Sequence, residues 1–260
     1  MNRPIFSVII PTYNNKHLLE VALSSVLRQR EVSVEIIVTD DSTTDEIEHY
    51  ISSLGKENIR YIHNKPSLGA VKNWNEGLKC ALGQYIIVLH HDESFANEWY
   101  LKDILSQMSK GYDIVVSNVE VIINGKEHRK KIIQKLEPYF LRYPVSLFVL
   151  NAIGPCACLT VRRDIVEKFD ESLCWYVDVE WYYRLLSKSS SIFFYNRKGI
   201  HSIHGHQGQI TMNMNFKKAE SSDYVIIKKK YNNRLINCSL SINKQIFSPV
   251  YKKILSCILK

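Results

Sequence analysis

Short apolar runs alternate with amphipathic stretches over the first ninety residues of the chain. Four short runs are predicted as buried strands, spanning residues 5–10, 34–39, 60–63 and 85–89. The stretches between them place apolar residues three and four positions apart, as on one face of a helix. These stretches span residues 16–29, 44–54 and 70–82. Strand and helix in alternation, with short connections, predict parallel βαβ units.

The second half of the chain has a less regular pattern. Strands are predicted at 114–117 and 120–123, before the turn Asn124-Gly125, and again at 157–161 and 191–196. Between the last two, apolar residues at helical spacing predict a helix that begins near Asp178. We divide the chain into three parts. We expect residues 1–93 to bind a nucleotide and residues 94–215 to bind a second substrate. Residues 216–260 form a basic tail.

The composition is that of an ordinary globular protein. The chain has 260 residues, of which 45% are hydrophobic and 23% charged, which excludes a disordered chain, a collagen and a disulfide mini-protein. No apolar run approaches the roughly 18–20 residues that a membrane span needs. The N-terminal apolar run is interrupted by Pro11, so we do not expect a signal peptide. Six cysteines without a CxxC pair indicate reduced thiols in a cytoplasmic protein.

The positive charge is concentrated at the C-terminal end. The formal net charge is +8, and residues 216–260 hold ten Lys and Arg but only two acids, so the rest of the chain is neutral. From Phe247 onward apolar residues recur at helical spacing. This tail predicts peripheral contact with an anionic membrane surface, at its inner face, rather than nucleic-acid binding. The alternative is a helix packed on the body with its lysines in solvent.

Polar side chains follow three of the predicted strands. They are Thr12, Tyr13 and Asn14 after the first strand, Asp40 and Asp41 after the second, and His90, His91 and Asp92 after the fourth. The carboxyl ends of parallel strands meet at one edge of a sheet, so we expect these groups to share a crevice. The chain has neither GxGxxG nor GxxxxGK[ST]. A bound nucleotide would therefore need a divalent cation on a carboxylate to neutralise its phosphates.

Five segments in this region resemble a known enzyme family. SVIIPTYNN, VLRQ, EIIVTDDSTTD, NKPSLGAVKNWNEGL and GQYIIVLHHDE follow one another within residues 5–93. In this order they resemble the inverting glycosyltransferases of family 2, and the resemblance continues more faintly to about residue 205. It implies an α/β fold of the GT-A type. This is a Rossmann-like, mainly parallel sheet with helices on both faces, joined here to a smaller acceptor-side region and a C-terminal helical tail.

The resemblance also implies the donor-binding residues. Pro11, Thr12 and Tyr13 match the loop that holds the nucleotide base, with the Tyr13 ring available for stacking. Asp41 matches the aspartate that hydrogen-bonds the base, and Asp40 is its neighbour. The alternative for paired aspartates after a strand is a helix N-cap. Lys72 and Asn73 match positions near the ribose or diphosphate, although Lys72 could equally lie on a solvated helix face.

The same resemblance places a metal site at His90-His91-Asp92, where the family has an acidic motif. Asp92 matches the metal-binding acid, and we expect it to bind Mn²⁺ or Mg²⁺. His91 would have to replace a carboxylate at the ribose, a departure that could also weaken the dependence on metal. Of His201, His204 and His206, which we expect in a loop after the strand 191–196, we favour His204 as a further metal ligand. The alternative is an ordinary loop at each place.

The general base is implied by an acid that is followed six residues later by arginine. Asp178 and Arg184 fit this spacing, and Glu180 is the second candidate. Such a carboxylate would take the proton of the acceptor hydroxyl as that hydroxyl attacks the anomeric carbon. The alternatives are an N-cap for Asp178 and an ion pair with Arg184 for Glu180.

Together these residues predict an inverting glycosyltransferase. It would move a sugar from a nucleoside diphosphate sugar, UDP-linked by preference, to a hydroxyl of a growing glycan, and the basic tail suggests a lipid-linked glycan as acceptor. One alternative is a catalytically inactive nucleotide-binding protein of the same fold. The other is a zinc hydrolase that uses His201, His204 and His206.

Overall fold

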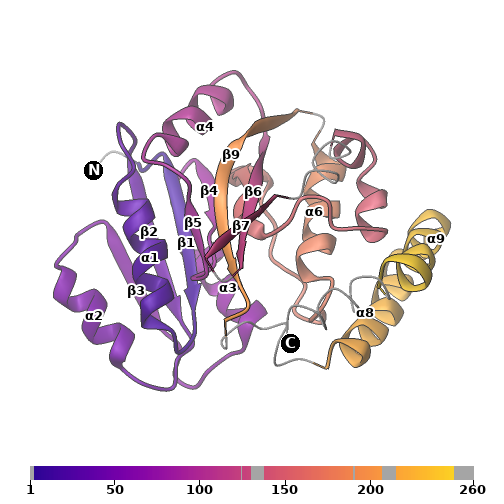
Figure 1. Ribbon diagram of the computed structural model, residues 1–260, viewed down its shortest axis with the longest axis horizontal. Helices are drawn as coiled ribbons and strands as arrows, with labels where there is room; N and C mark the ends of the chain where they lie inside the picture. The colour runs from indigo at the N-terminus through magenta and orange to yellow at the C-terminus, as the bar shows by residue number, and fades with distance from the viewer. Residues whose placement is uncertain (1–2, 124, 130–137, 190, 207–214, 249–260) are drawn as a thin grey trace.

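Nine strands form one sheet through the part of the chain that the structure describes. The computed structural model describes residues 3–123, 125–129, 138–189, 191–206 and 215–248. The strands follow one another across the sheet in the order β3-β2-β1-β4-β8-β6-β9-β5, and β7 pairs with β6 (Figure 1). The predicted α/β class with helices on both faces is confirmed, but only the first half of the sheet is parallel throughout.

The parallel half is built from the first ninety residues. Its strands are β1 (Phe6–Thr12), β2 (Val34–Asp40), β3 (Ile59–His63) and β4 (Tyr85–Val88), and its helices are α1 (Lys16–Leu27), α2 (Glu46–Leu54) and α3 (Ala70–Cys80). All three strand pairings are parallel. Because crossover connections are right-handed and the chain reverses direction across the sheet after β3, α3 covers the face opposite to α1 and α2 (Figure 1).

The burial of the first strands explains why the sequence pattern predicts them. All seven residues of β1 are buried, so its sequence is a continuous apolar run rather than an alternation of apolar and polar residues. On α3, Gly77 faces β1 and β2, where a Cβ atom would collide with the side chain of Ile9. This close approach brings the first turn of α3 against the carboxyl ends of β1 and β2.

The second half of the sheet is mixed. It contains β5 (Glu93–Phe95), β6 (Ile114–Ile123), β7 (Lys126–Arg129), β8 (Leu159–Arg162) and β9 (Ile192–His204). Strand β8 lies antiparallel between β4 and β6, whereas β9 runs parallel to β6 and antiparallel to β5. The helices of this half are α4 (Tyr100–Met108) and α6 (Val177–Lys188), with short 3₁₀ turns at Pro144–Phe148, Cys156–Cys158 and Arg163–Ile165.

Two strand predictions in this half were wrong. The runs 114–117 and 120–123 belong to one strand, β6, whose pairing with β9 is irregular between Ser117 and Val119. The run 191–196 continues through Gly199 to His204, because β6 on one side and β5 on the other supply backbone partners. His201 and His204 therefore lie in a strand and not in a loop.

The C-terminal segment packs on the body of the protein. Helices α8 (Phe216–Tyr231) and α9 (Arg234–Ile242), followed by the π-helical turn Asn243–Phe247, lie beside α6 (Figure 1). Asp223, Ile227, Ile236 and Leu240 are buried, and the lysines at 228 and 229 are exposed. Packing on the body is thus the observed arrangement for residues 215–248, while most of the helix predicted from Phe247 lies outside the described residues. Within those residues no helix has the length and apolarity that a membrane crossing requires.

Candidate active site

The loops after β1 and β2 are fastened to each other. Asn14 adopts a left-handed backbone conformation with φ of 45°. Its backbone N–H donates to Oγ of Ser42 at 2.7 Å, and its side-chain Oδ1 accepts from the N–H of Thr43 at 3.0 Å. Pro11 and Thr12 are buried at the end of β1, but the next residue, Tyr13, is 49% exposed. The hydrogen bonds between Asn14 and residues 42 and 43 leave the Tyr13 ring accessible beside the loop that carries Asp41.

Asp41 is the centre of a hydrogen-bond network that shapes the loop before α3. Its Oδ1 accepts from the backbone of Leu68 at 2.8 Å and from Nδ2 of Asn64 at 3.2 Å. Its Oδ2 accepts from Oγ of Ser67 at 2.6 Å and from the backbone of Gly69 at 2.8 Å. Burial opposes ionisation, but these four donors outweigh it and lower the pKa of Asp41.

Both oxygens of Asp41 are thus already engaged. A carboxylate offers about four acceptor positions, so a nucleotide base could bond to Asp41 only by sharing an oxygen with, or displacing, one of these donors. The predicted contact with the base remains a prediction. In the structure, the Asp41 carboxylate instead contacts residues 64–69. The conformation of these residues decides where α3 begins.

Asp40 and Asn73 are also buried and bonded within the protein. Asp40 accepts from the backbone of Ser42 at 2.8 Å and from the Tyr61 hydroxyl at 2.7 Å. The amide of Asn73 donates to the carbonyl of Thr39 at 3.0 Å and accepts from Asn64 at 2.8 Å. These two residues hold the strand ends, whereas Lys72 is exposed on the first turn of α3 and free to approach a ligand.

Asp92 lies against the end of β9. Its carbonyl accepts from the backbone of Ile203 at 2.8 Å, and its carboxylate Oδ2 lies 3.1 Å from Nε2 of His206. Burial opposes ionisation of Asp92, but the hydrogen bond from His206 and the nearby imidazoles lower its pKa. His206, two residues beyond the end of β9, makes this contact, and the expectation that His204 joins Asp92 stays a prediction.

The groups around Asp92 are of the kinds that bind divalent cations, although among the described residues their ligand atoms do not lie as close together as those of a formed ion site. The ring centroids of His91 and His206 are 6.3 Å apart, and Nδ1 of each ring is buried without a hydrogen-bond partner among the described residues. Burial lowers the pKa of His91 to about 4, so its ring is neutral and keeps a lone pair at neutral pH. Carboxylate oxygens and imidazole nitrogens are ligand types that Mn²⁺ accepts.

The three histidines predicted as a zinc site do not come together. Nε2 of His201 lies 3.5 Å from Oε2 of Glu120, while Nε2 of His206 faces Asp92. Within the described residues these histidines do not form a group of ligand atoms close enough to share one ion. The structure therefore offers no support for the zinc hydrolase.

Next to Asp92, His90 and Glu93 form a buried pair. Oε1 of Glu93 lies 3.2 Å from Nδ1 of His90, and the His90 ring packs on Trp74 with centroids 4.7 Å apart. Burial raises the pKa of Glu93. Burial lowers the pKa of His90, but the negative charges of Glu93, Asp92 and Asp178 outweigh it and raise that pKa. The charge of Asp178, at the start of α6, therefore acts on the His90 ring.

Asp178 stands in the first turn of α6. Its Oδ2 accepts from Nδ2 of Asn151 at 3.0 Å, and its Oδ1 accepts from the backbone of Val179 at 2.9 Å. The side chain is only partly buried. These two bonds are made by different oxygens of the carboxylate.

Glu180 has a different environment from Asp178. Its side chain is fully buried and accepts from Nε of Arg184 at 2.9 Å, from Nζ of Lys230 at 2.8 Å and from the Tyr231 hydroxyl. Burial opposes ionisation, but these donors lower the pKa of Glu180. A carboxylate enclosed by two cations and a hydroxyl cannot reach an acceptor, so the geometry favours Asp178 as the base.

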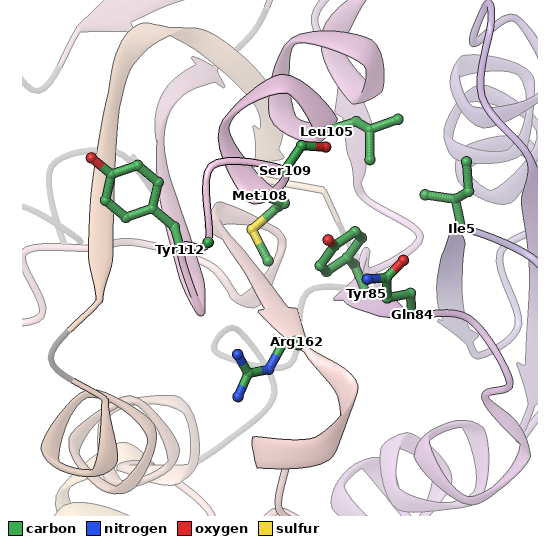
Figure 2. A pocket seen from close by; sticks show the side chains of 9 residues that line it. Ile5, Gln84, Tyr85, Leu105, Met108, Ser109, Tyr112 and Arg162 are labelled. Carbon is green, nitrogen blue, oxygen red and sulfur yellow. The ribbon is translucent and has the colours of Figure 1, made fainter.

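An open cavity lies at the opposite edge of the sheet. It has a volume of about 460 Å³ and is lined by residues that include Ile5, Tyr85, Met108 and Arg162 (Figure 2). Ile5 precedes β1 and Tyr85 begins β4, so the cavity faces the amino ends of these strands. Ligands of open α/β sheets bind at the carboxyl ends, and none of the predicted site residues lines this cavity.

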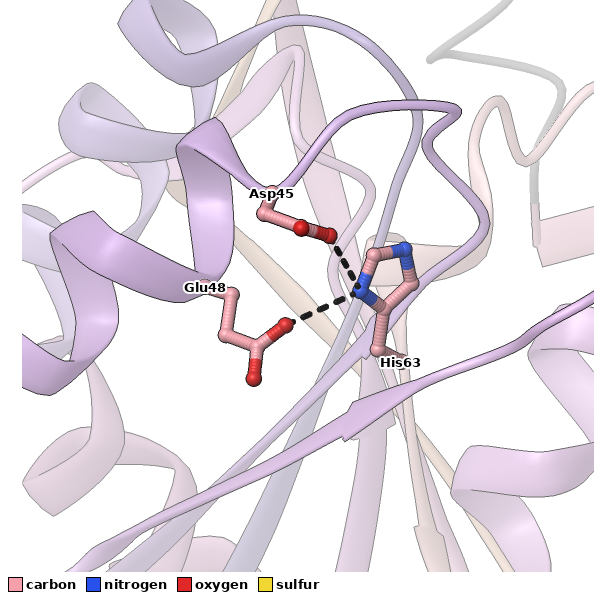
Figure 3. Close-up of side chains that lie close together, drawn as sticks. All are labelled: Asp45, Glu48 and His63. Carbon is pink, nitrogen blue, oxygen red and sulfur yellow. Dashed lines mark hydrogen bonds and ion pairs between the residues drawn. The ribbon is translucent and has the colours of Figure 1, made fainter.

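Asp45, Glu48 and His63 form a second group of potential metal ligands (Figure 3). Nζ of Lys65 already lies 2.8 Å from Asp45 and 3.6 Å from Glu48, so the protein supplies the positive charge itself. Nε2 of His63 lies 3.0 Å from the carbonyl of Ser42. The group therefore ties the end of β3 to the loop that follows β2.

Comparison with known proteins agrees with this geometry. The family model described as "Glycosyl transferase family 2" matches residues 7–170. The putative colanic acid biosynthesis glycosyl transferase WcaA of Escherichia coli (strain K12) is 35% identical over 100 residues, 38% of this chain and 34% of WcaA. The GalNAc(5)-diNAcBac-PP-undecaprenol beta-1,3-glucosyltransferase of Campylobacter jejuni is 30% identical over 138 residues, 51% of this chain and 44% of that protein. The chain thus covers less than half of either relative.

A solved structure shows the same fold. Residues 1–349 of S. aureus TarS, in complex with UDP-GlcNAc, match with a TM-score of 0.71 over 92% of this chain and 71% of that one. The sequence identity is 17%, so the likeness concerns the fold alone. It confirms the predicted GT-A type.

The Asp41 network leads to a stability prediction. Asp41→Asn puts an NH₂ group opposite two donors, and we expect the free energy of unfolding to fall by about 1–3 kcal/mol. Glu57→Gln, at an exposed position, is the control. Because the pKa of Asp41 is lowered from 3.8, its contribution is complete well above pH 3.8 and is lost as the pH falls through the folded-state value. Denaturant unfolding from pH 7 to pH 3 should show the difference between wild type and variant shrinking; a constant difference would contradict the assignment.

Proposed function

The chain belongs to glycosyl transferase family 2, and from this membership we propose that it is an inverting enzyme that transfers a sugar from a nucleoside diphosphate sugar to a hydroxyl of a glycan. UDP-linked sugars are the donors we favour. The observation that carries the proposal is the family match over residues 7–170. It is supported by the parallel pairing of β1 with β4, which brings the loops of Tyr13 and Asp92 to one edge of the sheet, and by the charge of Asp178, which acts on His90.

On the donor side, the exposed Tyr13 ring stacks on the nucleotide base beside the Asp41 loop. Lys72 and the start of α3 face the ribose and diphosphate. Asp92, with His206 and His91, holds Mn²⁺ or Mg²⁺. When bound, this cation neutralises the charge that develops on the diphosphate leaving group. The complex of TarS with UDP-GlcNAc supports a nucleotide sugar as donor for this fold.

On the acceptor side, Asp178 is the general base. The acceptor hydroxyl oxygen bonds to the anomeric carbon while its proton passes to Asp178, and the bond from that carbon to the diphosphate oxygen breaks on the opposite face. One displacement of this kind inverts the anomeric configuration. Asn151 orients the carboxylate through its bond to Oδ2. Glu180 holds α6 in place and does not touch substrate.

The acceptor we favour is a lipid-linked glycan, reached from the cytoplasmic face of a membrane. Leu235, Cys238, Ile242 and Ile246 are exposed at spacings of three and four along α9 and the turn after it, with Arg234 and Lys244 also exposed. An apolar stripe beside cations is suited to the interface of an anionic bilayer. The Campylobacter relative, whose name specifies an undecaprenol-linked substrate, supports this choice.

The base assignment predicts different effects for the two acids of α6. Asp178→Asn should lower kcat by about 10²–10⁴-fold, the usual contribution of a general base, while the affinity for UDP and the unfolding temperature stay close to wild type. Glu180→Gln should instead lower the free energy of unfolding by about 1–3 kcal/mol, because it weakens a buried network. Transfer can be followed by UDP release with a panel of UDP sugars and acceptors.

Two outcomes would contradict this picture. Normal turnover in Asp178→Asn removes that residue as the base. Tight UDP binding by the wild type, with neither transfer nor donor hydrolysis across the panel, favours the inactive binding protein of the same fold.

The metal assignment predicts that EDTA abolishes transfer and that Mn²⁺ restores it. Asp92→Ala should lower the rate at saturating Mn²⁺ by at least about tenfold. His206→Ala should raise the Mn²⁺ concentration needed for half of the maximal rate, because His206 lies against Asp92. His204→Ala is the matched control and should change this concentration less. Full activity of Asp92→Ala in EDTA would exclude the site.

The membrane assignment predicts binding to vesicles that contain phosphatidylglycerol. Replacing Leu235 and Ile246 by serine should lower binding about tenfold or more, since each apolar side chain contributes roughly 1.5–3 kcal/mol when fully buried. Val225→Ser, an exposed apolar position on α8, is the control. Vesicle flotation measures the effect, and turnover with a water-soluble acceptor should not change. Equal binding by all three proteins would refute the role of the stripe.

A further inference from the structure

The residues before α6 are held by a side chain from the C-terminal segment. The Oδ2 atom of Asp223, on α8, accepts from the backbone N–H groups of Cys174 at 2.9 Å, Trp175 at 2.6 Å and Tyr176 at 2.9 Å. Its other oxygen accepts from Sγ of Cys174 at 3.5 Å. The Asp223 side chain is fully buried. Three consecutive N–H groups therefore converge on one carboxylate oxygen.

Helix α6 has no local substitute for this contact. Its N-cap residue is Tyr176, whose side chain makes no capping hydrogen bond. The N–H groups before and within the first turn of a helix otherwise need side chains or water as partners. A negative charge at this end also interacts favourably with the helix dipole. Asp223, from a distant part of the chain, thus binds the N–H of the N-cap residue and those of the two residues before it, and so fixes the chain where it enters the helix.

The start of α6 decides where Asp178 lies. Asp178 comes two residues after Tyr176, in the first turn, and its backbone conformation follows from that of residues 174–176. The end of α8 holds the first turn of α6 itself, and the turn after α9 holds Tyr176. Lys230 and Tyr231 bond to Glu180, and Asn243 accepts from the Tyr176 hydroxyl at 2.9 Å.

We infer that Asp223 is a positioning residue for the proposed base: it fixes residues 174–176, and through them it places the Asp178 carboxylate in the donor crevice. This inference rests on the proposed function. It gives the segment 215–248 a part in catalysis, although the family match ends at residue 170. Removing a partner that touches neither donor nor acceptor should then impair the chemical step.

The test compares Asp223→Ala with Asp223→Asn. Alanine removes every acceptor, and asparagine keeps a neutral one of the same shape. The exposed Lys229→Ala on the same helix is the control. Because a displacement of about 1 Å can cost about 10²-fold in rate, we expect kcat to fall by at least about tenfold in Asp223→Ala and by less in Asp223→Asn. The KM for the donor and the Kd for UDP should stay within about twofold, since the donor residues lie on β1, β2 and β4.

A second measurement separates this inference from the proposed function. Hydrogen exchange at the amides of Cys174, Trp175 and Tyr176 should become at least about tenfold faster in Asp223→Ala, whether or not the protein transfers sugar. If exchange is faster in Asp223→Ala but the wild type transfers no sugar, the hydrogen-bond contact is supported and the proposed function has failed. Where Asp223→Ala does not fold, as judged by thermal unfolding, Asp223→Asn decides alone.

Three results would overturn the inference. The first is unchanged exchange at these amides in a folded variant. The second is faster exchange with unchanged kcat, which would show that Asp178 does not depend on residues 174–176. The third is a parallel loss of kcat and of UDP affinity in a folded variant, which would indicate a general loosening of the protein rather than misplacement of the base.

Discussion

The parallel pairing of β1 with β2 and β4 is the constraint on which the rest of the site depends. In this register Thr12 lies beside Asp40, and Ile9 lies beside Val88. The polar loop after each strand therefore begins at the same edge of the sheet. Because the loops start close together, a few hydrogen bonds, such as those between Asn14 and residues 42 and 43, are enough to fix their relative positions.

Buried carboxylates then fix the segments that carry the chemistry. Asp41 holds the loop before α3, Asp223 holds the approach to α6, and Glu180 joins α6 to α8. A buried charge is tolerated only when several donors surround it. The loss of one such acid leaves N–H groups or cations without partners, so each acid favours one arrangement of the segments that it joins. These acids work as parts of the framework, whereas Asp92 and Asp178 are only partly buried.

The sequence predicted the elements whose signal is local. The strands β1–β4 and helices α1–α3 were found with their bounds displaced by a few residues, because burial of each element imposes its own period on the chain. Strand β9 was predicted too short, because its exposed residues 196 and 197 interrupt the apolar pattern, and beyond them the pairing of Lys198 and residues 200–204 with β6 continues the strand. Strand β5 has three residues and leaves no periodic signal. The contact of His206 with Asp92 depends on where β9 ends, and the role of Asp223 depends on helix packing, so neither could be derived from spacing.

The irregular pairing of β6 with β9 has a consequence for how the crevice could change in evolution. Ser117 is paired with Tyr195 and the next residue, Asn118, with Lys198, so β9 holds additional residues at this point. They are exposed, and a deletion among them would require little repacking. Removing one would shrink the bulge and leave the pairing of residues 200–204 with β6 in register, so Ile200 and Ser202 would stay buried. The strand can thus change its length at the surface while the imidazole that faces Asp92 keeps its place.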